Sequence, residues 1–128
     1  MHTIETVFTK DAPPAIGPYS QAKAVGSMLF TSGQIPINPK SGEVDQNDIT
    51  WQATQALENL MAVLKAGNSC AENVIKTTCF LADMGDFLAF NKVYEGYFPG
   101  NPARSCVAVK TLPKNVLCEV EAIALRNE

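Results

Sequence analysis

Histidine and arginine are scarce in this chain of 128 residues, and their scarcity excludes several kinds of chemistry. The only histidine is His2, so the chain offers no internal imidazole for a Ser-His-Asp triad or a Cys-His pair. The four cysteines form no Cys-x-x-Cys pair, although a zinc site needs clustered Cys or His ligands. They are Cys70, Cys79, Cys106 and Cys118. We therefore expect no metal centre and four free thiols that pack as small hydrophobic groups.

Long apolar runs, basic runs and glycine-rich phosphate loops are also missing. No stretch reaches the roughly 20 apolar residues of a transmembrane helix, and no signal peptide is recognisable. The net charge of −3 and the pI of about 5.1 argue against a surface that neutralises many phosphates. We expect a soluble cytoplasmic protein that needs no cofactor, has no membrane partner and does not have nucleic acid as its main partner.

Hydrophobic residues make up 46% of the chain, which is typical of a globular protein, and the length suits one domain over residues 1–128. Alternating patterns predict strands, whereas apolar residues at intervals of three and four predict two helices. The expected strands cover 3–8, two arms around Gly26, 74–83, 104–109 and 116–125. The expected helices run from about 48 to 67 and from about 83 to 98.

This order predicts an α+β fold in which both helices cover one face of a mixed sheet. The last two strands are expected to pair in antiparallel fashion around the turn at 112–115. Two helices cover only one face, yet the strands carry apolar residues on both. The uncovered face therefore predicts a homo-oligomer.

Arg104, in the stretch NPARSC, is one of only two arginines, whereas there are eight lysines. The planar guanidinium group of arginine binds a carboxylate through two parallel hydrogen bonds, which a lysine ammonium group cannot do. Arg104 is therefore a candidate clamp for a carboxylate ligand. The alternative is an ordinary surface ion pair at the start of a strand.

Glu119 and Glu121 interrupt one otherwise apolar face of the last predicted strand. Buried carboxylates are costly unless they are paired or hydrogen-bonded, so this face borders either a polar pocket or solvent. The expected pairing of the last two strands would bring Arg104 near residues 119–122. Whether Arg104 and Glu119 share a face depends on the register, which the sequence leaves open.

Five segments resemble the Rid proteins, also called the YjgF family of reactive-intermediate deaminases. They are AIGPYSQA, FTSGQIPINPKSGEV, VIKTTCFLADMGDF, NPARSC and LPKNVLCEVEAIA. The resemblance runs in order over nearly the whole chain and is closest to the RidA branch. It implies a chorismate-mutase-like fold, a homotrimer with clefts between subunits, and hydrolysis of 2-imino acids such as 2-iminopropanoate and 2-iminobutanoate to 2-oxo acids and ammonia.

The resemblance also implies roles for single residues. Arg104 would bind the substrate carboxylate, and Glu119 would hold the attacking water. The substrate-binding positions would be Tyr19, Ser32, Asn91, Arg104 and Cys106, with Tyr19 reaching the cleft from a neighbouring chain and Cys106 contributing mainly backbone groups. The segment 99–101 is shorter than in many relatives, which predicts a reshaped rim beside Arg104.

Each role has an ordinary structural alternative. Tyr19 can pack its ring with the hydroxyl in water, Ser32 can belong to a turn beside Gly33, and Asn91 can be a solvated helix residue. Two other functions also stay open at this point. One is endoribonuclease or translation-inhibitor activity, described for some relatives, and the other is binding of a small oxo or amino acid without turnover.

Overall fold

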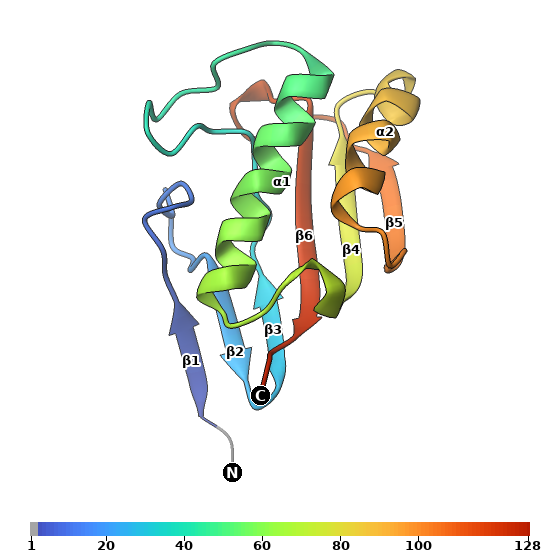
Figure 1. Ribbon diagram of the computed structural model, residues 1–128. Helices are drawn as coiled ribbons and strands as arrows, with labels where there is room; N and C mark the ends of the chain where they lie inside the picture. Colours follow the sequence, from blue (N-terminus) through green and yellow to red (C-terminus); the bar gives the residue numbers. More distant parts are fainter. Residues whose placement is uncertain (1–2) are drawn as a thin grey trace.

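Six strands form one mixed sheet, and two helices pack on one of its faces (Figure 1). This computed structural model describes residues 3–128, so His2 lies outside the described residues. The strands are β1 (Ile4–Val7), β2 (Ala22–Val25), β3 (Met28–Thr31), β4 (Val74–Leu81), β5 (Ala103–Ala108) and β6 (Cys118–Leu125). The helices are α1 (Ile49–Ala66) and α2 (Phe87–Tyr97). The predicted α+β fold and element order are confirmed.

Local signals explain where several elements begin and end. The β2–β3 hairpin turns directly after Val25, which pairs with Met28, and Gly26 adopts a φ of 56° that glycine tolerates at no steric cost. Asp48 caps α1, because its carboxylate accepts a hydrogen bond of 2.9 Å from the backbone N–H of Trp51. Neither α1 nor any other helix within 3–128 has the length and apolar character needed to cross a membrane.

The hydrophobic core lies between the helices and the sheet. From α1, Leu57, Leu60 and Leu64 are completely buried, and Phe90 of α2 is completely buried beside them. Most of the facing strand residues are alanine, valine or cysteine, with Val120 at the centre of the sheet, and Leu29 and Leu81 are the larger ones among them. Both helices therefore lie over the same face in Figure 1, as their apolar stripes predict.

The expected antiparallel pairing of the last two strands is wrong. The sheet order is β1-β2-β3-β6-β4-β5, so β4 lies between β5 and β6. β5 pairs with β4 in parallel, and β6 pairs with β3 and β4 in antiparallel fashion. The physical reason is α2, which forms the crossover between β4 and β5, and such a crossover joins parallel strands.

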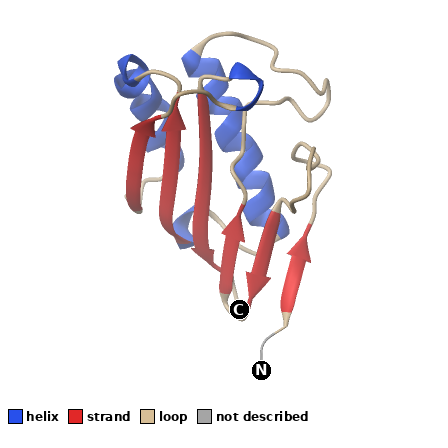
Figure 2. Ribbon diagram, turned by 180° about the vertical axis from the view of Figure 1, so that it is seen from behind, coloured by secondary structure: helices blue, strands red, loops and turns tan. Residues whose placement is uncertain are grey.

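The second face of the sheet carries neither α1 nor α2 (Figure 2). We call it the uncovered face. Among the side chains that the strand registers place on it are Lys23, Phe30, Phe80, Val107, Glu119, Glu121 and Ile123. Phe30 and Val107 are 43% and 47% exposed, which is high for apolar residues in a sheet. The uncovered face therefore carries exposed apolar side chains together with at least two carboxylates.

Candidate functional site

Arg104 lies on the edge strand β5 and extends toward the helices. Its position in the register pairs it with Thr77 of β4, which is buried beneath α2. The Nη1 atom of Arg104 donates a hydrogen bond of 2.7 Å to Oδ1 of Asn91 in α2. The guanidinium carbon lies 4.8 Å from the centre of the Tyr94 ring and 5.6 Å from that of Phe87. An amide oxygen and two aromatic rings therefore hold the guanidinium group.

No carboxylate neutralises Arg104 within residues 3–128. The one ion pair of this part of the chain joins Arg126 to Glu5 at 2.8 Å. Arg104 instead borders an open hollow of about 340 Å³. Its other lining residues are Asn91, Tyr94, Glu95, Asn101 and Pro102. A half-buried guanidinium group with spare N–H donors beside a hollow is suited to bind an anion, and a planar carboxylate fits its geometry.

Glu119 lies on β6 and borders a second hollow, of about 480 Å³. Burial raises the pKa of Glu119, and the neighbouring charge of Glu121 raises it further. A raised pKa makes the ionised carboxylate a stronger proton acceptor than an ordinary surface glutamate. The hollow is lined by Ile16, Tyr19, Ser32, Gly33, Ile35, Pro113, Glu119 and Glu121.

Tyr19 and Ser32 therefore share a hollow with Glu119. The Tyr19 hydroxyl accepts a hydrogen bond of 3.3 Å from the backbone N–H of Ile16, and about half of Tyr19 is exposed. The Ser32 hydroxyl donates a hydrogen bond of 2.5 Å to the carbonyl oxygen of Ser20. This bond fixes the Ser32 oxygen, which keeps lone pairs free to accept from a ligand.

Arg104 and Glu119 point away from opposite faces of the same sheet. Arg104 pairs with Thr77, whereas Glu119 pairs with Phe80, three residues farther along β4. Because side chains alternate along a strand, positions three residues apart face opposite ways. The candidate site residues thus form two groups in one chain. Arg104 and Asn91 lie on the helix side, and Tyr19, Ser32 and Glu119 border the other hollow.

Cys106 lies two residues beyond Arg104 on β5 and shares its face. Its partner in the register is Cys79, and burial raises the pKa of both thiols, that of Cys79 to about 12. Neutral thiols are poor nucleophiles, and Cys106 does not line the hollow beside Arg104. The surroundings of Cys106 therefore favour packing over covalent chemistry.

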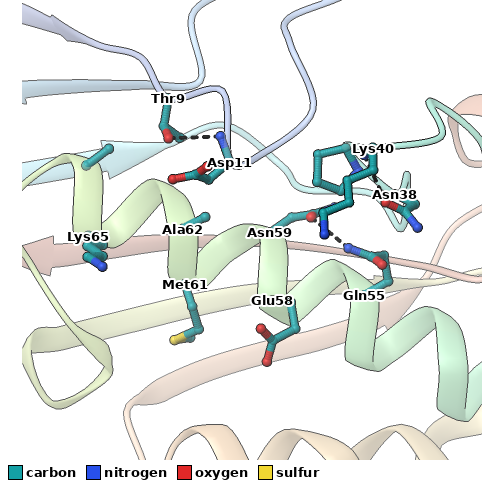
Figure 3. Close-up of a pocket in the computed structure, with 12 residues that line it drawn as sticks. Thr9, Asp11, Asn38, Lys40, Gln55, Glu58, Asn59, Met61, Ala62 and Lys65 are labelled. Atoms are coloured by element: carbon teal, nitrogen blue, oxygen red, sulfur yellow. Dashed lines mark hydrogen bonds between the residues drawn. The ribbon is translucent and has the colours of Figure 1, made fainter.

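A third hollow, of about 820 Å³, runs along α1 and contains none of the predicted site residues (Figure 3). Two of its amide side chains are already hydrogen-bonded. Gln55 donates to Oδ1 of Asn59 at 2.9 Å, and Asn59 donates to the carbonyl oxygens of Ile35 and Ile37. This hollow is an open polar surface that joins the loop at 38–40 to α1.

Comparison with known proteins gives the family. The family model described as Endoribonuclease L-PSP matches residues 9–126. The chain belongs to the Endoribonuclease L-PSP family, also called the YjgF or Rid family. The resemblance of the five sequence segments to Rid proteins is thereby confirmed, and the match extends from just after β1 to just past the end of β6.

Members of the L-PSP family are similar to this chain over nearly its full length. A protein of Escherichia coli K12 named 2-iminobutanoate/2-iminopropanoate deaminase is 48% identical over 126 residues, which covers 95% of this chain and 98% of that protein. A RutC family protein of Pyrococcus horikoshii is 51% identical over 123 residues, which covers 95% of this chain and 98% of that protein.

Solved structures of L-PSP relatives share the fold. The YjgF gene product of Escherichia coli superimposes with a TM-score of 0.90 at 46% identity and covers 96% of this chain and 99% of its own. The structure of Escherichia coli TdcF with bound serine gives a TM-score of 0.91 at 45% identity, with the same coverage. The fold predicted from the resemblance is therefore confirmed.

Sequence reasoning missed three residues that shape the two hollows. Tyr94 and Thr77 support Arg104, and Gly33 leaves room for the Glu119 side chain. Tyr94 follows Asn91 by three residues, a spacing that places both on one side of a helix, so this signal was present in the sequence. No sequence signal indicated the contact between Gly33 and Glu119, because it joins segments far apart in the chain.

Proposed function

We propose that this chain hydrolyses small 2-imino acids, 2-iminopropanoate and 2-iminobutanoate, to 2-oxo acids and ammonia without a cofactor. One observation carries the proposal: Arg104 has no acidic partner within residues 3–128 and faces a hollow together with Asn91. A guanidinium group left available in this way suits a substrate carboxylate. The name of the Escherichia coli relative, an imine deaminase at 48% identity, supports the same activity.

Because Arg104 and Glu119 point away from opposite faces of the sheet, the proposed site takes its two groups from two copies of the chain. We propose a homotrimer in which the hollow beside Arg104 of one copy meets the hollow beside Glu119 of the next. The apolar groups of the uncovered face support such an assembly, because Phe30 and Val107 lose exposed surface when another copy covers them. In a closed trimer, three copies form three equivalent clefts.

The proposed reaction needs a bound substrate and a placed water rather than a covalent nucleophile. Arg104 binds the carboxylate and so presents carbon 2 of the protonated imine to the opposite wall. Glu119 accepts a proton from water while the water oxygen bonds to carbon 2. Glu119 returns this proton to the nitrogen of the resulting carbinolamine. As the carbon–nitrogen bond breaks and the carbonyl forms, Glu119 takes the hydroxyl proton, and ammonia and the 2-oxo acid leave. Tyr19 and Ser32 line the wall around Glu119.

A coupled assay tests the clamp. A serine or threonine dehydratase generates the imine, and release of the 2-oxo acid is followed above the uncatalysed rate. We expect Arg104→Ala to lower kcat/KM about 100-fold, because two charge-assisted hydrogen bonds are lost, and Arg104→Lys to restore little of it. Arg126→Lys is the control and keeps the wild-type rate. Unchanged rates in both Arg104 variants would exclude the clamp.

Complementation between inactive variants tests the shared cleft. Arg104→Ala and Glu119→Gln are purified separately, mixed under mild denaturant and reassembled. If each cleft takes Arg104 from one copy and Glu119 from another, about a quarter of the clefts in an equal mixture regain both groups. Activity then returns on mixing. A mixture that reassembles and stays as inactive as its components would show that one chain supplies both groups.

The family description also names an endoribonuclease, so RNA cleavage is the second candidate. The acidic charge balance weighs against it, since RNA binding relies on cationic side chains. RNA cleavage at low salt that disappears in Arg104→Ala would favour this candidate. Binding of 2-oxobutanoate without any imine turnover would instead indicate a metabolite-binding module.

A further inference from the structure

The Tyr94 ring lies directly behind the proposed clamp. The guanidinium carbon of Arg104 is 4.8 Å from the centre of this ring, a distance at which the cation is attracted to the face of an aromatic ring. Asn91, three residues earlier on α2, accepts the hydrogen bond from Nη1. Asn91 and Tyr94 of α2 therefore both hold the guanidinium group. Asn91 accepts a hydrogen bond at the edge of this group, and the Tyr94 ring lies close to the guanidinium carbon.

Tyr94 is itself held in place by buried neighbours. Its hydroxyl forms a hydrogen bond of 2.6 Å with Oγ1 of Thr77 on β4. Its ring packs against Phe98 and Phe90, with ring centres 4.7 and 5.9 Å away. Only 8% of Tyr94 is exposed, and burial raises the pKa of its hydroxyl, which stays neutral. The ring therefore cannot turn away without losing its hydrogen bond to Thr77 and its packing against the two phenylalanine rings.

We propose that Tyr94, fixed by Thr77, is a positioning residue that orients Arg104 for the substrate carboxylate. The inference rests on the proposed function and deepens it. A free arginine side chain must lose rotamer freedom when it binds a carboxylate in bidentate geometry. The Tyr94 ring removes that freedom beforehand and leaves the remaining N–H groups of Arg104 facing the hollow. Tyr94 touches no substrate atom in this role and acts through Arg104.

Because the chain has only two arginines, NMR can observe the orientation of Arg104 directly. A spectrum of arginine Nε–H groups contains two signals, and Arg126→Lys assigns them. We expect a nuclear Overhauser effect between the Arg104 Nε–H and the Tyr94 ring protons in the wild-type protein. We also expect Tyr94→Leu to move the Arg104 signal, because the ring current is lost, while the Arg126 signal stays in place.

Kinetics separate positioning from general stability. Tyr94→Leu is expected to raise KM about tenfold with kcat little changed, because substrate affinity depends on an oriented guanidinium group. Tyr94→Phe keeps the ring face and its packing against Phe90 and Phe98, so its KM should stay within about threefold of wild type. Leu57→Ala, a core substitution on α1, controls for lost stability and should leave KM unchanged.

Several outcomes would overturn this role. They are a missing Overhauser effect in the wild type, equal KM values for Tyr94→Leu and wild type, or an equal rise in KM for Tyr94→Phe and Tyr94→Leu. If Tyr94→Leu does not fold, the wild-type Overhauser effect and the KM of Tyr94→Phe still test whether Tyr94 positions Arg104. The NMR measurements need no turnover. A wild-type protein without imine hydrolysis would therefore contradict the proposed function and leave the test of Tyr94 intact.

Discussion

Gly33 determines where the Glu119 carboxylate can lie. A methyl group on Gly33 would overlap the side chain of Glu119, with its Cδ atom only 2.7 Å away. The end of a glutamate side chain is flexible, so the conflict is relieved when Glu119 moves rather than when the backbone shifts. The absence of a side chain at residue 33 thus positions a carboxylate that is distant in the sequence.

Gly33→Ala is therefore expected to lower imine hydrolysis about tenfold or more, since small displacements of a catalytic group are costly. The melting temperature should change little, because only the end of a side chain has to move. The coupled assay and thermal unfolding measure the two effects. A large drop in melting temperature with full specific activity would contradict this explanation.

Glu119→Gln is expected to stabilise the folded protein at neutral pH. Burial and Glu121 raise the pKa of Glu119 in the folded state above its unfolded value, so ionisation disfavours folding. The stability that protonated Glu119 contributes is fully present below its pKa in the unfolded state. It is lost as the pH rises through its pKa in the folded state. The melting temperature of the variant should exceed that of wild type at pH 7, and the difference should disappear near pH 4.

At the residue scale the sequence singled out candidate residues but did not indicate what surrounds them. Arg104 stood out because arginine is rare in the chain, and Glu119 because it interrupts an apolar face. Their surroundings depend on contacts between segments distant in the chain, as between Gly33 and Glu119. Such contacts follow from the strand registers, which local patterns do not contain.

Among the elements, β4 has the largest effect on the site. It pairs with β5 on one side and β6 on the other, so the strand of Arg104 does not pair with the strand of Glu119. The sequence predicted the six strands, but the predicted pairing joined the consecutive strands β5 and β6. Consecutive strands are neighbours in only about two-thirds of cases, and the return of β6 to the centre of the sheet is a long-range pairing.

α2 carries both Asn91 and Tyr94, so its packing should control stability and substrate binding together. Phe90→Ala is expected to cost about 3–5 kcal/mol of unfolding free energy, because a fully buried ring leaves a cavity beneath the helix. Leu88→Ala on the same helix is the control, since Leu88 is 81% exposed. Urea unfolding compares the two, and equal losses would show that α2 does not depend on this buried face.

The whole molecule presents apolar groups on the uncovered face, and its assembly should depend on them. Val107→Glu is expected to give a folded monomer without imine hydrolysis, because a charge cannot be buried unpaired between copies. Light scattering gives the mass, and circular dichroism confirms the fold. Met84→Glu, an exposed position outside the strands, is the control and should leave the assembly intact. An active monomer would contradict the shared cleft.

The opposite orientations of Arg104 and Glu119 also have a genetic consequence. In the proposed trimer, each copy would border two clefts and would contribute Arg104 to one and Glu119 to the other. A copy with both groups substituted would disable two of the three clefts while its neighbours remain intact in sequence. When such a defective allele is expressed beside a normal one, it should be dominant, whereas alleles that affect only one of the two groups should partly rescue each other.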